Sequence, residues 1–347
     1  MTDRINIKII TEKRSDAIHI CNESLILNLK KENDNIEVVS LNNKIFKNSF
    51  LNFVLEIINT IKVIFVTNKD DIILFTDPLS FNIIASLFIR NKKYAIFYHY
   101  ENNPFYYKFI PFVSYEKILS KLDGIICISN FSLSQLIPLG IDTDKCKVVY
   151  YGLDHELFRP SPSDRYSFDY ILCVGSEEPR KNMGNILKSF QLLKKDFPNL
   201  KLLKVGRASS KNRSETIRHV KELQLMESVI FTDYVEEKEL PKIYSAAKLL
   251  LFPSLLEGFG LPIVEAMACG CPVVTSNRNP MKELIGSEQH TVDPLNPEDI
   301  ATACKKILSD HEYRNSVIHK GLIRAREFDW EKTSTEIYAY LKRGKES

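Results

Sequence analysis

The sequence is poor in the features that several protein classes require. Its seven cysteines are odd in number and form no CxxC pair, a pattern that suits buried thiols in a reducing cytosol. No run reaches the roughly 18 uncharged apolar residues of a membrane-spanning helix, and the start MTDRINIKII lacks the plan of a signal peptide. Neither charge dominates, since 47 basic and 44 acidic residues leave +3, which argues against a nucleic-acid partner. We expect a cytoplasmic protein, soluble or peripheral at the inner face of a membrane.

The 347 residues predict two domains, because a single hydrophobic core rarely grows so large. Short apolar, β-branched runs indicate strands that are buried on both faces, as in a parallel sheet. A first series lies at 5–10, 36–41, 71–77, 93–99, 123–129 and 147–152, and a second at 169–175, 200–206, 228–235, 248–254 and 271–276. The segments between them carry helical spacing, such as the apolar stripe behind an expected Asn182 cap that comprises Met183, Ile186, Leu187, Phe190, Leu193 and Phe197.

Strand and helix alternate in both series, which predicts two Rossmann-like, doubly wound α/β domains. The stretch Pro160 to Ser163 marks a linker, so we expect a first domain over 1–160 and a second over 161–330. A terminal helix over 331–347 is expected to return toward the first domain. Ligands of such sheets bind beyond the carboxyl ends of the strands, so the loops after the strands should hold the site.

The motif EGFGLPIVEAMACG, from Glu257 to Gly270, is the strongest candidate for such a site. Gly258 and Gly260 follow a strand, and Pro262 suits the first turn of a helix. Backbone N–H groups of residues 259–264, Pro262 excepted, would then point outward at the positive end of a helix, where a diphosphate can bind. Glu265 lies one turn inside, within reach of ribose hydroxyls. A plain strand-to-helix turn with a surface carboxylate would explain the glycines alone about as well.

The complete motif resembles the E-x7-E signature of family 4 retaining glycosyltransferases, which have the GT-B fold of two Rossmann-like domains facing across a cleft. That resemblance implies that Glu265 binds the ribose and that Glu257 sits near the donor sugar. It also implies that the backbone of Gly258, Phe259, Gly260 and Leu261 binds the donor phosphates. Further similarity in SNFS, YGLD, TDYV, CPVVTS, MKELIG, VDPLNPEDIA and FDWEK covers about residues 120 to 340 and is nearest to the mannosyltransferase-like subgroup.

A second match is VGSEEPRKN, from Val174 to Asn182, after the first strand of the second domain. Arg180 and Lys181 stand just before a helix, where two cations could neutralise the charge that develops on a leaving diphosphate. A Lys-Arg pair is usually only a solvated surface, but the match to the family's EPRKN segment favours the catalytic role. The same match assigns Gly175 to the residues that bind the donor. Many members carry an arginine after this glycine where the present chain has Ser176.

The first 120 residues resemble the family less. No glycine precedes Gly124, and TEKRSDAIH (11–19) stands where the family has a glycine-rich loop. His99 matches a histidine that many members aim at the donor hexose, so we expect it on the opposite wall of the cleft, although a structural histidine is an equal alternative. The aromatic stretch 100–119 leaves three alternatives open: an acceptor pocket, docking on a membrane surface, or core packing.

The reaction implied is transfer of a hexose from an NDP-sugar to a hydroxyl of a saccharide or lipid-linked acceptor, with retention at the anomeric carbon. It belongs to polysaccharide or glycoconjugate biosynthesis, and subgroup resemblance alone favours GDP-mannose. We expect no metal and no cofactor, because the histidines lack metal-ligand spacing and the family is metal-independent. Two alternatives remain open: a GT-B sugar-nucleotide epimerase or hydrolase, and a non-catalytic subunit that binds nucleotide sugar. A dehydrogenase is disfavoured, since no GxGxxG follows a strand.

Overall fold

The computed structural model describes residues 5–13, 17–42, 49–77, 81–98, 114–162, 166–286 and 291–346. The chain forms two compact units, one from Met1–Gly152 with Asp329–Ser347 and one from Leu153–Phe328. Both divisions fall before the expected ends of domains at residues 160 and 330. The expected linker itself bonds within the second unit, where the Ser161 amide donates to the Ser245 hydroxyl at 3.0 Å.

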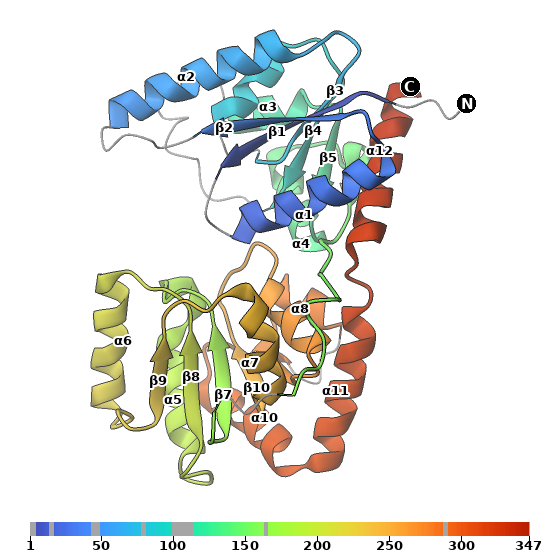
Figure 1. Ribbon diagram of the computed structural model, residues 1–347. Helices are drawn as coiled ribbons and strands as arrows, with labels where there is room; N and C mark the ends of the chain where they lie inside the picture. Colours follow the sequence, from blue (N-terminus) through green and yellow to red (C-terminus); the bar gives the residue numbers. More distant parts are fainter. Residues whose placement is uncertain are drawn as a thin grey trace. The chain divides into compact units, whose positions relative to one another are not determined.

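The first unit contains a parallel sheet of six strands in the order β2-β1-β3-β4-β5-β6. The strands are β1 (Ile7–Lys13), β2 (Ile36–Asn42), β3 (Ile72–Phe75), β4 (Lys93–Phe97), β5 (Gly124–Cys127) and β6 (Cys146–Val148). The helices are α1 (Ala17–Glu32), α2 (Ser49–Val66), α3 (Tyr115–Ser120), α4 (Asn130–Leu136) and α12 (Trp330–Glu346), with 3₁₀ helices at Phe81–Leu87, Ile137–Leu139 and Thr143–Lys145. Helices α1 and α2 lie on opposite faces of this sheet (Figure 1), which explains why its strands are apolar on both sides.

Helix α12 packs on the first unit although it ends the chain. Its Thr335 hydroxyl donates to the Glu32 carboxylate of α1 at 2.8 Å, and the Tyr340 hydroxyl donates to the Lys145 carbonyl at 2.6 Å. The chain enters this unit beside Gly152, where a Cβ would lie 2.3 Å from the backbone nitrogen of Trp330. Only a glycine lets the two chain segments approach so closely.

The second unit contains another parallel sheet of six strands, in the order β12-β11-β10-β7-β8-β9. The strands are β7 (Tyr170–Val174), β8 (Lys201–Val205), β9 (Val229–Thr232), β10 (Leu249–Phe252), β11 (Val273–Ser276) and β12 (Thr291–Val292). The helices are α5 (Met183–Leu193), α6 (Ser210–Glu222), α7 (Leu240–Ala246), α8 (Leu261–Ala268), α9 (Met281–Ile285), α10 (Pro297–Ser309) and α11 (His311–Ala325), with 3₁₀ helices at Pro179–Lys181 and Glu237–Glu239.

Alternation along β7 shows how the second sheet is covered on both faces. Ile171 and Cys173 enter a core with the buried side chains of α5 and α10. Tyr170 points to the other face, where its hydroxyl donates to the Ile243 carbonyl of α7 at 2.7 Å. The sheet is therefore doubly wound, and ligands of such a sheet bind beyond the carboxyl ends of its strands.

The order of the second sheet fixes where a ligand should bind. The chain runs from β7 outward to β9 and then returns to the other side of β7 with β10. The loops after β7 and β10 therefore leave the sheet in opposite directions, and the crevice between them is the topological switch point. The two strongest sequence motifs, 174–182 and 257–270, begin in these two loops.

Candidate functional site

The loops after β7 and β10 are bonded to each other. The Leu255 amide donates to the Arg180 carbonyl at 2.7 Å, and the side-chain amide of Asn182 donates to the Pro253 carbonyl at 2.9 Å. The same Asn182 amide also donates to the Pro294 carbonyl at 2.6 Å. Asn182 precedes α5 as predicted, but it has a left-handed backbone and makes no side-chain cap hydrogen bond. Its side chain instead ties the cation-bearing loop to the end of β10.

One ion-paired cluster, which we call the charged trio, comprises Arg180, Lys181 and Glu257. The Lys181 ammonium lies 2.7 Å from Glu257 Oε1, and the Arg180 guanidinium lies 2.9 Å from Glu257 Oε2. The side chains of Glu257 and Lys181 are 7% and 11% exposed, whereas that of Arg180 is 39% exposed. Two cations share one buried carboxylate, and Arg180 pairs in addition with Glu178, whose side chain is 50% exposed and whose charge solvent therefore screens. Such a site favours an anion.

Gly175 lies directly under the Lys181 side chain. A Cβ at Gly175 would be 3.3 Å from Lys181 Cε and 3.4 Å from its Nζ, and the glycine has φ +125°. The ammonium also stands 4.7 Å from the centre of the Phe252 ring. Glycine is therefore required here both by the backbone conformation and by the space that the lysine occupies.

Helix α8 begins beside the trio and carries the second glutamate. Gly260 is its N-cap with φ +115°, and Leu261 and Pro262 open the first turn. The prediction of free N–H groups over residues 259–264 is wrong at Ile263, whose amide donates to the Gly260 carbonyl at 2.9 Å, because the first turn tightens. Gly258 is partly exposed, whereas the Phe259 side chain is buried. The Phe259 ring packs edge-on against Phe328 with centroids 6.1 Å apart, so only its backbone is placed to meet a ligand.

Glu265 accepts a hydrogen bond from the Tyr244 hydroxyl of α7 at 2.6 Å. Burial raises the pKa of this carboxyl group to about 7, while the tyrosine hydrogen bond opposes that shift. The side chain is only half-buried. Sequence reasoning did not identify Tyr244, because its segment KIYSAA has no feature beyond the spacing of an ordinary helix.

The structure thus brings Arg180, Lys181, Glu257 and Gly175 into direct contact and places Glu265 on the helix that follows the same loop. The roles assigned to these residues from the resemblance stay predictions. His99 lies outside the described residues, as does most of the aromatic stretch 100–119. Over the described part of the chain no group of three or more His, Cys, Asp and Glu side chains could hold a metal ion.

The family model for glycosyl transferases group 1 matches residues 156–323. This part of the chain is thus similar to glycosyl transferases group 1. Two curated relatives support this similarity. The chain is 32% identical over 232 residues to the O-antigen chain mannosyltransferase B of Escherichia coli, which covers 62% of the chain and 60% of that protein. It is 28% identical over 227 residues to an N-acetylgalactosaminyltransferase of Campylobacter jejuni whose name includes diphospho-undecaprenol. That match covers 64% of the chain and 60% of the relative.

The chain thus spans less than two thirds of each of these relatives. Solved structures match over nearly its whole length. Anabaena Alr3699/HepE in complex with UDP and glucose gives a TM-score of 0.79 at 19% identity, over 97% of this chain and 99% of that one. Sucrose-phosphate synthase from Thermosynechococcus elongatus gives 0.79 at 18% identity, over 98% and 99%. These matches confirm the predicted two-domain GT-B fold. The facing of the domains across a cleft, with His99 on one wall, stays a prediction.

Among the helices of the described residues, none is long and apolar enough to cross a membrane. Its site residues come from the two loops at the switch point of one sheet, so the second unit alone supplies the trio and Glu265.

Proposed function

We propose that the chain is a retaining hexosyltransferase that moves a hexose from an NDP-sugar to a hydroxyl of a saccharide or lipid-linked acceptor. Polysaccharide or glycoconjugate biosynthesis is the process in which we place it. The observation that carries the proposal is the charged trio at the switch point of a sheet that lies within the group 1 glycosyl transferase match. An anionic diphosphate is the ligand that these two neighbouring cations and the adjacent helix end favour.

In the reaction, the bond between the anomeric carbon and the phosphate oxygen breaks as a bond to the acceptor oxygen forms on the same face. The acceptor proton passes to the departing phosphate. Lys181 and Arg180 stabilise the negative charge that grows on the leaving diphosphate, and Glu257, which holds both cations, keeps them oriented. Retaining hydrolases use two carboxylates across the bond, but here Glu257 is held by cations and Glu265 by a tyrosine.

The donor is proposed to bind without a metal ion, because two cations and a helix end supply the charge that a divalent ion would supply. We propose GDP-mannose as the donor, since relatives named as mannosyltransferases include the one from Escherichia coli. The complexes of Alr3699/HepE hold UDP or UDP-glucose, so UDP-sugars are the main competitors.

Thermal-shift screening against UDP-, GDP- and ADP-sugars, followed by turnover with acceptor in the presence of EDTA, tests this function. Stabilisation by one nucleotide series and glycoside formation in chelator are expected. Consumption of NDP-sugar without acceptor would indicate an epimerase or hydrolase instead. Binding without any turnover by the purified chain would indicate a non-catalytic subunit, and turnover that needs a restored divalent ion would contradict the metal-free mechanism.

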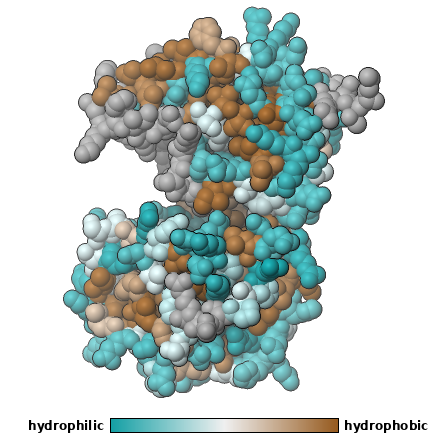
Figure 2. All heavy atoms as spheres, viewed as in Figure 1, coloured by the Kyte–Doolittle hydropathy of each residue, from teal (hydrophilic) through white to brown (hydrophobic). Residues whose placement is uncertain are grey.

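We also propose peripheral contact with the inner face of the cytoplasmic membrane, through the outward face of α2. This helix buries the polar residues Glu56, Asn59 and Thr60 and exposes apolar ones, the reverse of an ordinary surface helix. Its exposed large apolar side chains are Leu51, Ile57, Ile58, Ile61 and Phe65, with Phe65 83% exposed. Figure 2 shows the apolar surface over this helix.

The charge of α2 and the name of one relative favour a lipid surface as the partner of this face. Lys62 is the exposed charge among the described side chains of α2, because Glu56 is 4% exposed, so an anionic surface meets no repulsion there. The Campylobacter jejuni relative is named for a diphospho-undecaprenol acceptor, which is a lipid. Co-sedimentation with vesicles containing phosphatidylglycerol should fall for Phe65→Ser and persist for Leu27→Ser, an exposed leucine of α1. Equal sedimentation of both variants and the wild type would reject this contact.

A further inference from the structure

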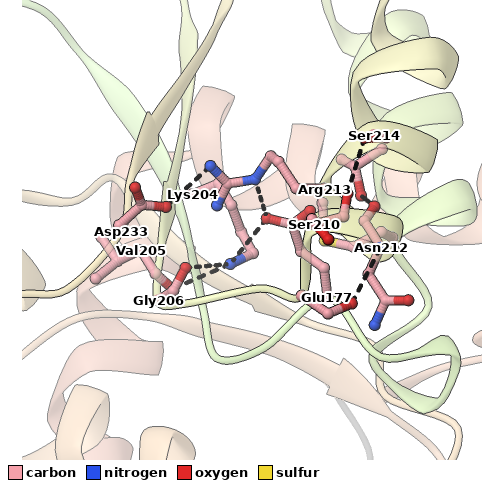
Figure 3. A network of polar contacts seen from close by, with 12 residues as sticks. Glu177, Lys204, Val205, Gly206, Ser210, Asn212, Arg213, Ser214 and Asp233 are labelled. Carbon is pink, nitrogen blue, oxygen red and sulfur yellow. Dashed lines mark hydrogen bonds and ion pairs between the residues drawn. The ribbon is translucent and has the colours of Figure 1, made fainter.

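Lys204 is a fully buried lysine in the strand next to the cation-bearing loop. Its side chain on β8 is 0% exposed. The ammonium donates to the Gly175 carbonyl at 2.6 Å. It also donates to the carbonyl oxygens of Val205 at 3.3 Å and Gly206 at 3.5 Å (Figure 3). A buried ammonium needs such partners, because removing it from water is costly. Lys204 therefore holds the backbone at the ends of β7 and β8 in one arrangement.

Glu177 and Arg213 complete this network from the loop and from α6. The Glu177 carboxylate is 0% exposed, lies 3.7 Å from the Lys204 ammonium, and accepts a hydrogen bond from Arg213 Nε at 2.8 Å. Arg213 also pairs with Asp233 at 2.9 Å and stacks over the Phe231 ring at 4.6 Å. The segment between Gly175 and Lys181 is thus anchored at Glu177 as well as at Gly175.

The carbonyl contacts of Lys204 determine where two amide groups point. In a trans peptide the C=O and N–H bonds point in opposite directions. The Gly175 and Gly206 carbonyls turn inward to the ammonium, so the amides of Ser176 and Arg207 turn away from it. Both glycines have positive φ, +125° and +122°, which permits this orientation. Neither amide donates a hydrogen bond within the described part of the chain.

We propose that Lys204 is a positioning residue that directs the amides of Ser176 and Arg207 toward the diphosphate of the donor nucleotide. The inference rests on the proposed function. Two backbone amides at neighbouring strand ends that point away from the ammonium are able to donate to one anion. Ser176 follows Gly175, whose Cβ position lies 3.4 Å from Lys181 Nζ, and it contributes no cation of its own. Burial lowers the pKa of Lys204, while the nearby Cys173 and Glu177 side chains oppose that shift.

Lys204→Met tests the inference, because methionine is apolar, similar in length and unable to bind the carbonyls. Lys201→Met is the matched control, since Lys201 lies on the same strand and its ammonium binds only the Glu227 carbonyl at 2.8 Å at the surface. Affinities for GDP and UDP and for the corresponding nucleosides are measured by NMR titration. Lys204→Met should lower the ratio of diphosphate to nucleoside affinity at least tenfold, and Lys201→Met should leave it unchanged.

An equal loss of nucleoside and diphosphate affinity would show a merely structural role and overturn the inference, as would an unchanged ratio in a folded variant. Lys204→Gln, which keeps one donor, should show an intermediate ratio and serves if the methionine variant does not fold. The amide resonances of Ser176 and Arg207 should shift downfield when the wild type binds the diphosphate and should stay in place in Lys204→Met. A wild-type chain that binds neither diphosphate would overturn the proposed function itself, whereas binding without these shifts overturns only the role of Lys204.

Discussion

Arg180 and Lys181 hold the same carboxylate but differ in their surroundings. Lys181 is enclosed by Glu257, Gly175 and the Phe252 ring, whereas Arg180 also pairs with the exposed Glu178 at 2.8 Å. Solvent screens the charge of an exposed guanidinium more than that of an enclosed ammonium. Lys181 should therefore contribute the larger part of the charge stabilisation.

Lys181→Ala should lower kcat by about a hundredfold, as does the loss of one preorganised oxyanion donor, because the charge it faces grows only in the transition state. Arg180→Ala should lower kcat less. Lys188→Ala, on the exposed side of α5, is the matched control and should change neither constant. Steady-state kinetics with a saturating acceptor measures these effects. If Lys181→Ala leaves kcat and KM unchanged in a folded protein, the pair is a solvated surface.

Glu265 should make nucleotide binding depend on pH. Its pKa is raised to about 7, and ribose hydroxyls donate to the ionised carboxylate, so binding should strengthen as pH rises through 7. Since about one tenth of the group is ionised at pH 6, affinity should be about tenfold weaker there than at pH 8. Isothermal titration between these pH values measures the change. Glu265→Gln should abolish this dependence and raise the donor KM with little effect on kcat.

Tyr244→Phe supplies the control for that dependence. The tyrosine hydroxyl donates to Glu265, so its removal should raise the pKa of the carboxyl group further and move the midpoint of the binding curve to higher pH. The ring, which packs near Phe158 with centroids 6.5 Å apart, is retained. A midpoint that stays in place would mean that the measured dependence belongs to the ligand phosphate and not to Glu265.

Two glycines on either side of the 3₁₀ helix Pro179–Lys181 should respond in opposite ways to alanine. Gly175→Ala places a Cβ against Lys181 at φ +125°, which should cost about 1–2 kcal/mol of stability and displace the ammonium, so activity should fall as well. Gly184→Ala meets nothing within 4 Å in the first turn of α5 and should stabilise by about 0.5–1 kcal/mol with activity kept. Urea unfolding and turnover measure both. Loss of stability in Gly184→Ala would contradict the open helical environment.

At the level of elements, the sequence predicted the strands well because their apolar runs are buried on both faces. Every predicted run overlaps an observed strand, whereas β12 was missed because two residues, Thr291 and Val292, form no recognisable run. Helix α5 was predicted from its apolar stripe, but it ends at Leu193, and Phe197 packs on the core from the turn that follows. Boundaries of this kind depend on tertiary packing and leave little trace in local periodicity.

The candidate site was predictable where backbone chemistry determines it and not where tertiary partners do. Glycines, prolines and charged residues at strand ends predicted the loops at 175–182 and 257–261, and the structure joins them. Tyr244 comes from another helix, and Lys204 lies within an apolar strand run, so nothing in the local sequence distinguishes either residue. Their partners are carbonyl and carboxylate oxygens that only the fold brings near them.

At the scale of the whole molecule, the chain builds its first unit from two separate segments. Helix α12 supplies Ile337 and Leu341, which are 1% and 0% exposed, to a unit whose other residues end at Gly152. The second unit, with the trio and Glu265, is one continuous segment from Leu153 to Phe328. A substitution that damages α12 should therefore destabilise the first unit, most of which is distant from α12 in sequence. The second unit, which directly precedes α12 in sequence, should be unaffected.

Leu341→Ala should destabilise the first unit by about 2–5 kcal/mol, the usual cost of truncating a fully buried leucine. Hydrogen exchange measured by mass spectrometry should quicken in peptides from β1 and β5 and stay unchanged in those from β7 and β10. The affinity for nucleotide diphosphates should be retained, because the trio and Glu265 lie in the second unit. Lys332→Ala, exposed on the first turn of α12, should leave exchange in both units as in the wild type. Equal quickening in both units would show that they unfold as one body, and the division of the chain into separately stable units would then be wrong.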